Sequence, residues 1–204
     1  MSARSSVVMT LVTSLWLLAI GCGLLVLLQY SYRPGEVGAA LDHWPAQTKL
    51  QFVDRKPNLV MFLHPKCPCS RASLREFEEI VARCQDLLHG QIVFVRPRDA
   101  SPKWVETDLW HAATAIPGVS VSTDFPGQSA ARFGARTSGH TFLFDSKRAL
   151  VFSGGITSSR GHEGDNVGRD SIVKILQTDV SGSSEPTQFP VFGCPLLGPA
   201  DSSL

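Results

Sequence analysis

Residues 59–70, LVMFLHPKCPCS, decide the fold of this 204-residue chain. The first five of them are apolar, which is typical of a strand buried on both faces of a sheet. The apolar run ends at His64 and Pro65, and Cys67 and Cys69 follow at once. Beyond them the pattern changes to that of an amphipathic helix. The stretch therefore predicts a buried strand that leads into a helix, with two thiols at the turn between them.

The rest of the chain continues this alternation of strands and helices. Apolar side chains recur every three or four residues between Leu74 and Leu88, which predicts an amphipathic helix. Residues 92–95 predict a second buried strand, and a right-handed crossover makes it parallel to the first. The remaining predicted elements are helices over 105–115, 128–133 and 170–176, and a hairpin of strands 141–144 and 149–152. This order predicts an α/β fold with a mixed central sheet flanked by helices.

The composition is that of a globular protein. Apolar residues make up 43% of the chain and charged residues 18%, which excludes a disordered chain. The 19 Lys and Arg residues balance 18 Asp and Glu residues, and no basic block is present, so we expect no binding to nucleic acid. The length allows one ordinary domain and an anchor, but not two full domains.

The N-terminal stretch Val7–Leu28 contains no charged residue. A helix rises about 1.5 Å per residue, so this stretch is long enough to span the ~30 Å hydrocarbon core of a bilayer. The alternative is a lipoprotein signal, because Ala19–Cys22 loosely resembles a lipobox, but the chain stays apolar for six residues beyond Cys22. We therefore predict a single-pass transmembrane anchor. The short N-terminal tail favours a cytoplasmic N-terminus, with the soluble domain on the other side of the membrane.

These signals divide the chain into four parts. They are a transmembrane anchor at 1–30, a linker at 31–56, an α/β domain at 57–178 and a flexible tail with Cys194 at 179–204. The linker and the tail are assigned from their polar and turn-forming residues, among them the stretch 181–186.

The order of elements from Gln51 to Leu176, together with the approach FLHPKC (62–67) to the first thiol, resembles the thioredoxin family. More narrowly, HPKCPCSRASL, TSGHTFLF, FSGGITSSRGHEGDN and VFGCPL resemble a group of membrane-anchored bacterial proteins called RedB. The resemblance implies a thioredoxin-like fold and a thiol–disulfide oxidoreductase of the periplasm, held in the bacterial cell membrane. Two departures argue against the ordinary thioredoxin reaction. Ser70 stands where the family has its second cysteine, and His140 stands near the position of its cis-proline.

A cysteine at the start of a helix is chemically useful, because the thiolate is both the nucleophile and the metal ligand. Unpaired backbone N–H groups and the helix dipole favour the anion there. Lys66 and Arg71 add positive charge nearby, and His64 adds more when it is protonated. We therefore predict that Cys67 is an accessible thiol with a lowered pKa.

The other cysteines have different expected roles. A disulfide between Cys67 and Cys69 closes a tight ring, and strain makes such a bond easier to reduce. Cys194 follows a flexible stretch and can return to the site, either as a resolving thiol or as a structural disulfide partner. Cys84 lies on the apolar stripe of the first helix and is expected in the core. We predict Cys67, Cys69 and Cys194 as catalytic residues, and their pairing is left open.

Three functions are compatible with these residues. The first is a thiol–disulfide oxidoreductase that acts on protein thiols or disulfides without a cofactor. The second is a Cu(I)-binding or copper-delivery protein, because soft thiolates select Cu(I), with Cys67, Cys69 and either His64 or Cys194 as ligands. The third is a non-catalytic module that uses the same fold. The loop 160–166 carries ligand-type side chains, but its spacing fits no metal site, so we predict a solvated loop.

Overall fold

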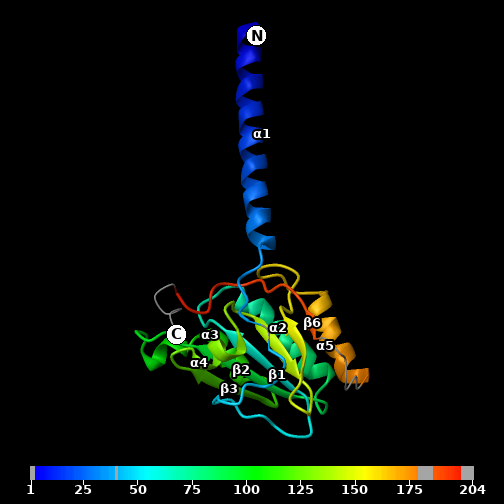
Figure 1. Ribbon diagram of the computed structural model, residues 1–204. Helices are drawn as coiled ribbons and strands as arrows, with labels where there is room; N and C mark the ends of the chain where they lie inside the picture. Colours follow the sequence, from blue (N-terminus) through cyan, green and yellow to red (C-terminus); the bar gives the residue numbers. More distant parts are fainter. Residues whose placement is uncertain (1–2, 40, 179–185, 199–204) are drawn as a thin grey trace. The chain divides into compact units, whose positions relative to one another are not determined.

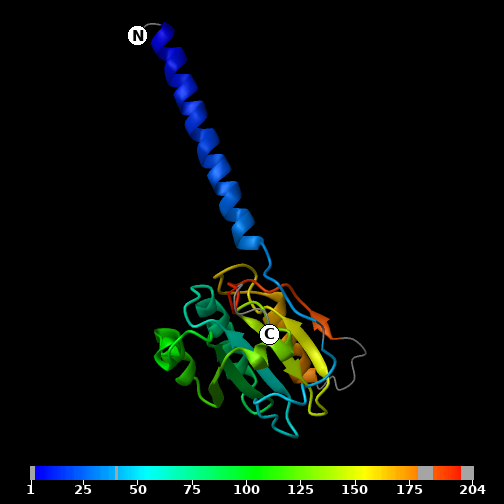
Figure 2. The same ribbon diagram turned by 60° about the vertical axis from the view of Figure 1, so that its left-hand side comes forward.

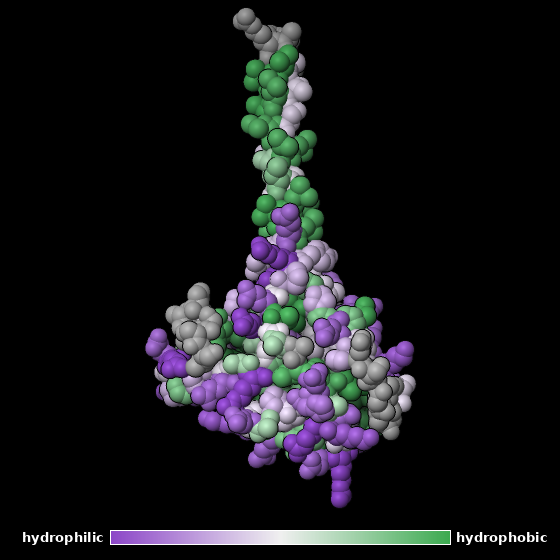
Figure 3. Space-filling model, in the orientation of Figure 1, coloured by the Kyte–Doolittle hydropathy of each residue, from purple (hydrophilic) through white to green (hydrophobic). Residues whose placement is uncertain are grey.

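The computed structural model describes residues 3–39, 41–178 and 186–198. They divide into two compact units, Met1–Arg33 and Pro34–Leu204. The first unit consists of helix α1 (Ala3–Tyr32). Its stretch Ser5–Tyr32 contains an 18-residue window with a mean hydropathy of 2.5 and is long and apolar enough to cross a membrane. Figure 3 shows hydrophobic side chains along most of this helix. The uncharged stretch Val7–Leu28 lies entirely inside it.

The second unit alternates strands and helices in the order that the sequence indicates. The elements are β1 (Asn58–Leu63), α2 (Ser70–Arg83), β2 (His89–Val95), η1 (Pro102–Val105), α3 (Asp108–Thr114), β3 (Val119–Asp124), α4 (Gln128–Phe133), β4 (His140–Phe144), β5 (Leu150–Gly154), α5 (Val167–Thr178) and β6 (Thr187–Gln188).

The strands form one mixed sheet in the order β3-β2-β1-β4-β5-β6 (Figures 1 and 2). β1, β2 and β3 run parallel, β4 is antiparallel to β1, and β5 is antiparallel to β4. The short β6 pairs parallel with β5. A central β1 between a parallel β2 and an antiparallel β4, with helices on both faces, makes this a thioredoxin-like fold.

The fully apolar β1 is explained by its central position, because both of its faces are covered. Leu59, Met61 and Leu63 point into a core formed with α2, α3 and α5. Val60 and Phe62 point to the opposite face, where α4 packs. All five side chains are fully buried, and burying one such side chain contributes roughly 1.5–3 kcal/mol. The strand therefore fixes the position of the turn that follows it.

Most predicted elements are confirmed. β1 leads into the amphipathic α2, β2 is parallel to β1, and β4 and β5 form the expected hairpin. Helix α4 has the predicted bounds, and α5 extends the predicted last helix at both ends. These elements carry strong local signals, because an apolar run, a helical period or a polar turn marks each of them.

The region from 102 to 124 differs from the prediction. The predicted helix 105–115 is instead the 3-10 helix η1 followed by α3. The side chain of Thr107 accepts a hydrogen bond from the backbone N–H of Trp110, which caps α3 and makes it a separate helix. β3 lies at the sheet edge and has only Asp124 buried. It has no apolar run to mark it, so the sequence does not reveal it.

The segment expected as a linker at 31–56 packs on the domain over much of its length. Trp44 is buried and makes edge-to-face ring contacts with Phe52, Phe133 and Phe144. His43 forms a β-bridge with Ala149. Aromatic side chains of α4 and β4 thus hold a segment whose polar composition suggested a spacer.

The C-terminal segment also differs from the flexible tail expected at 179–204. Residues 186–198 are described, and they include β6 and the buried Val191 and Leu196. Residues 179–185 and 199–204, which include all but the last residue of the stretch 181–186 expected to be flexible, lie outside the described residues. Burial of these two apolar side chains brings Cys194 onto the domain.

Candidate active site

The first two thiols of the second unit, Cys67 and Cys69, lie where β1 turns into α2, as predicted. Cys69 is the N-cap residue of α2, and Cys67 lies two residues before it. The backbone N–H of Cys67 donates to the carbonyl of His64 at 3.1 Å, and the N–H of Ser70 donates to the carbonyl of Cys67 at 3.1 Å. These two bonds form the tight turn that presents the cysteines at the start of the helix.

Three of the four cysteines of this unit form one cluster. The sulfur of Cys194 lies 2.7 Å from that of Cys67, and the sulfurs of Cys67, Cys69 and Cys194 all lie within 4.8 Å of one another. The fold therefore brings the three predicted catalytic residues together. Cys84 lies elsewhere, buried in the core beneath α2, as expected for a packed cysteine.

Cys67 is buried, which corrects the expectation of an accessible thiol. Only 5% of Cys67 and 8% of Cys69 are exposed, whereas Cys194 is partly exposed. The reason is that the returning chain covers the turn. The N–H of Ser138 donates to the carbonyl of Cys194, and the N–H of Leu196 donates to the carbonyl of Arg136, each at 2.8 Å.

The hydrogen bonds around Cys67 favour its anion. Burial opposes ionisation, but the thiol of Cys194, the hydroxyl of Ser70 and backbone groups act against it, so the pKa of Cys67 is lowered. The hydroxyl of Ser70 in turn lies 2.6 Å from that of Ser138, which accepts the N–H of His64 at 2.8 Å. A network of small hydroxyls thus supports the thiolate, and the predicted direction of the shift holds for this buried sulfur.

The other two thiols of the cluster are held protonated. Burial and the neighbouring Cys67 raise the pKa of Cys194 to about 12. Burial and the same neighbour raise the pKa of Cys69. Cys67 is therefore the thiol that ionises first, and the thiol of Cys194 donates a hydrogen bond to its thiolate.

The charges expected to assist Cys67 are arranged differently. Burial and the adjacent Lys66 lower the pKa of His64, so this ring is neutral near pH 7. Its Nδ1 accepts the N–H of Lys66 at 3.1 Å, and its ring lies edge-on to Trp104. Arg71 forms an exposed ion pair with Asp108. Neither His64 nor Arg71 is a free positive charge at the cluster.

Arg160 is the cation that sequence reasoning missed. Its charge favours the thiolate forms of both Cys69 and Cys194, and its guanidinium donates to the carbonyl of Gly193. It lies in the loop that the sequence predicted as solvated. Its position depends on contacts between distant parts of the chain, which no local pattern encodes.

The loop that carries Arg160 is fastened to α2 by a buried ion pair. Arg169 and Glu76 are joined at 2.7 Å, and their side chains are 8% and 4% exposed. Glu76 also accepts the N–H of Gly164 at 2.6 Å and the side-chain amide of Asn166 at 3.2 Å. The start of α5 and the preceding loop are thereby locked against the helix that begins at the cysteines.

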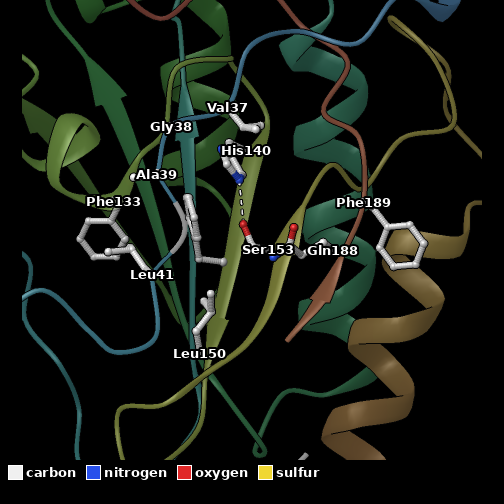
Figure 4. Close-up of a pocket in the computed structure, with 11 residues that line it drawn as sticks. Val37, Gly38, Ala39, Leu41, Phe133, His140, Leu150, Ser153, Gln188 and Phe189 are labelled. Carbon is white, nitrogen blue, oxygen red and sulfur yellow. Dashed lines mark hydrogen bonds between the residues drawn. The ribbon is translucent and has the colours of Figure 1, made fainter. Parts of the chain in front are cut away.

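His140, near the position expected for a cis-proline, lines a cavity to which none of the three clustered cysteines contributes (Figure 4). The cavity has a volume of about 80 Å³, and His140 is 3% exposed. Its Nε2 lies 3.0 Å from the hydroxyl of Ser153, and its Nδ1 has no hydrogen-bond partner among the described residues. Burial lowers the pKa of His140 to about 3, so the ring is neutral. Among the described residues the cis peptide bond precedes Pro126 instead.

Comparison with known proteins finds solved structures with a similar fold. No protein-family model matches the sequence, and no curated protein matches it. A hypothetical protein of Sinorhizobium meliloti has a similar structure, with a TM-score of 0.56 and 20% identity over 81% of this chain and 94% of that one. An uncharacterized conserved protein of Geobacillus kaustophilus gives a TM-score of 0.57 and 16% identity, over 82% and 94%. The exposed lipoprotein thioredoxin Etrx1 of Streptococcus pneumoniae gives 0.43 and 19%, over 60% and 84%.

Proposed function

We propose that this protein is a membrane-anchored thiol–disulfide oxidoreductase that acts on protein thiols or disulfides. The observation that carries the proposal is the 2.7 Å separation of the sulfurs of Cys67 and Cys194 at the start of α2. One of the two thiols has a lowered pKa and the other a raised one. This difference suits an attacking thiolate and a thiol that acts later.

The exchange follows from these positions. The thiolate of Cys67 attacks one sulfur of a substrate disulfide, whose S–S bond breaks as a mixed disulfide forms and a substrate thiolate leaves. Cys194 gives up its proton, attacks the sulfur of Cys67, and releases the second substrate thiolate. The substrate gains two electrons, and the protein is left with a disulfide between Cys67 and Cys194. With a dithiol substrate and an oxidised protein, the same steps run in reverse.

Cys69 supplies a second route for the resolving step. Its sulfur lies within 4.8 Å of both other sulfurs, so it can replace Cys194 in the attack on a mixed disulfide. The positive charge of Arg160 favours the thiolate of either residue. Three thiols at one site suit isomerisation as well as oxidation or reduction, because each thiol can attack a disulfide formed by the other two.

The location and the narrower family are part of the proposal. Helix α1 is apolar enough to hold the protein in a bacterial cell membrane, and we place the soluble domain on the periplasmic side, where disulfides persist. We also assign the chain to the RedB-like proteins. This assignment is supported by the two stretches HPKCPCSRASL and VFGCPL, because they supply all three cysteines of the cluster.

The test follows glutathione exchange in the full chain, reduced and kept in detergent micelles. Glutathione disulfide is added, and mass spectrometry reports which cysteine carries glutathione over time. Replacing Cys67 by serine abolishes exchange, and replacing Cys194 prolongs the lifetime of the adduct on Cys67. Replacing Cys84 is the matched control and leaves the time course unchanged. Unaltered exchange in the chain without Cys67 would overturn the proposal.

A second candidate function is Cu(I) transfer, favoured by the clustering of three thiols. Soft thiolates select Cu(I), and three sulfurs within 4.8 Å of one another suit this ion as cargo. Of the two predicted alternatives for the third ligand, Cys194 is the better supported, because among the described residues the cluster contains Cys194 and not His64. Anaerobic loading with a Cu(I)–acetonitrile complex distinguishes the candidates. The copper function would be favoured if the parent chain binds one Cu(I) ion tightly and shows no glutathione exchange. The bound ion should then be lost when Cys67 and Cys69 are both replaced by serine. Inactivity in both assays would indicate a non-catalytic module.

A further inference from the structure

The segment 191–197, termed here the cover segment, lies against the loop 136–138 like an added strand. Two backbone hydrogen bonds of 2.8 Å join the segments, one to the carbonyl of Arg136 and one from the N–H of Ser138. Thr137 and Pro195 form an antiparallel β-bridge between these bonds. This pairing sets Cys194 opposite Cys67. The contact has the geometry by which an extended peptide adds to a strand edge.

Small and apolar residues hold the cover segment close to the domain. Gly193 lies so near the carbonyl oxygen of Ser138 that a methyl group on its Cα would overlap that atom. The side chains of Val191 and Leu196 are each 1% exposed, and Leu196 packs into the core on the α4 face of the sheet. Arg160 also donates a hydrogen bond to the carbonyl of Gly193.

The same pairing closes the site to an external partner. Cys67 is 5% exposed, and the sulfur of Cys194 occupies the place from which another sulfur would have to approach. An intermolecular disulfide with Cys67 therefore requires the cover segment to move. Its movement frees the carbonyl of Arg136 and the N–H of Ser138, two unpaired backbone groups at an edge.

We propose that the edge 136–138 is the docking site for an extended, cysteine-bearing polypeptide segment, and that the cover segment is an internal occupant that leaves before the partner binds. The inference rests on the proposed function. The partner's backbone replaces the two hydrogen bonds, and its cysteine takes the place of Cys194. Because Leu196 fills a buried position two residues after Cys194, the edge selects an apolar side chain two residues after the partner's cysteine.

The docked partner enters the exchange already described. The thiolate of Cys67 attacks the partner's cysteine sulfur, the partner's disulfide breaks, and its other sulfur leaves as a thiolate. Return of the cover segment brings Cys194 back to the mixed disulfide. The displaced partner cysteine leaves as a thiolate, and a disulfide joins Cys67 to Cys194. The partner's disulfide is the only oxidant needed.

Gly193→Ala tests the cover segment without removing a side chain of the cluster, and Gly198→Ala is its matched control. A Cβ at Gly198 meets no atom within 4 Å, and that at Gly193 meets backbone. Iodoacetamide is added to the reduced full chain in micelles, and mass spectrometry measures labelling at each cysteine. Overpacking against backbone displaces the segment, so we expect Cys67 to be labelled at least about tenfold faster in Gly193→Ala than in Gly198→Ala. Continued protection of Cys84 shows that the core is folded.

A second measurement tests the docking edge with peptides. The peptide PVFGCPLL (190–197) and its variant with Asp in place of Leu196 are each prepared as a mixed disulfide with thionitrobenzoate. The absorbance of released thionitrobenzoate then follows transfer to Cys67 of Gly193→Ala. We expect the parent peptide to react at least about tenfold faster than the variant, because a buried apolar contact is lost.

The outcomes separate this inference from the proposed function. Equal labelling of Cys67 in the two glycine variants, or equal rates with the two peptides, overturns the inference even if glutathione exchange still requires Cys67. Loss of glutathione exchange from the parent chain overturns the proposed function and the redox docking edge together. Faster labelling combined with the peptide preference supports the inference.

Discussion

Replacing Glu76 by alanine removes one partner of the buried ion pair that fastens the loop of Arg160 to α2. The side chains of Glu76 and Arg169 are 4% and 8% exposed, so the substitution leaves a guanidinium buried without its main partner. Removing one partner of a buried pair costs about 3–5 kcal/mol. Arg169 keeps two longer contacts to the exposed Asp165 and Asp170, so we expect the lower end, about 3 kcal/mol.

Glu79→Ala is the matched control, because it makes the same change on the same helix. Glu79 pairs with Arg83 at 2.7 Å, but both side chains are nearly half-exposed. An exposed pair of this kind contributes about 0.3–0.5 kcal/mol. The two substitutions therefore compare a buried and an exposed ion pair of equal length.

The assay is urea unfolding of the full chain in detergent micelles, followed by tryptophan fluorescence. With an m-value of ~2 kcal/mol/M, the midpoint falls by about 1.5 M urea for Glu76→Ala and by about 0.2 M for Glu79→Ala. Limited proteolysis in the loop 157–166 gives an independent readout, because the loop loses its fastening only in the first variant. Equal midpoint shifts in the two variants would refute the assigned role of Glu76.

Three further predictions concern the titrating groups. The pKa of His140 is about 3 in the folded protein and about 6.5 in the unfolded chain, so protons bind the unfolded chain first. The contribution of the neutral His140 to the free energy of unfolding is therefore complete above pH 6.5 and is lost as the pH falls toward 3. When the pH is lowered from 7 to 5, we expect the free energy of unfolding to fall by about 2 kcal/mol more in the parent protein than in His140→Gln. Urea titrations of both proteins at the two pH values measure this difference. Cys194→Ala removes the thiol hydrogen bond to Cys67, so the pH midpoint for alkylation of Cys67 rises, and an unchanged midpoint would exclude this cause. Under reducing conditions Cys84→Ser changes neither that midpoint nor the labelling rate of Cys67, because its sulfur lies outside the cluster; a change in either would contradict this placement.

Local patterns predicted the fold well where each element carries its own signal. The apolar run 59–63 gave a central strand, the helical period after Ser70 gave α2, and the polar turn 145–148 gave the hairpin. β3 was not predicted, because an edge strand with alternating serines has no apolar run. The burial of Trp44 was not predicted, because the aromatic residues that it contacts on α4 and β4 lie far along the chain.

The sequence predicted which thiols lie at the candidate site, but it did not predict the residues that surround them. The position of Cys67 follows from the strand and helix signals, and the return of Cys194 was one of the alternatives that its flexible approach allowed. The burial of Cys67, the place of Arg160 and the fastening of its loop by Glu76 depend on contacts between segments dozens of residues apart. Such contacts arise only when the complete sheet brings those segments together.

The central claim is that Cys67 and Cys194 form the working thiol pair. Treating the full chain in its native membrane with glutathione disulfide and then mapping disulfide-linked peptides by mass spectrometry tests it most directly. We predict a peptide in which Cys67 is joined to Cys194, with Cys84 recovered as a free thiol. Recovery of Cys194 joined to Cys84, or of Cys67 free after complete oxidation, would contradict it.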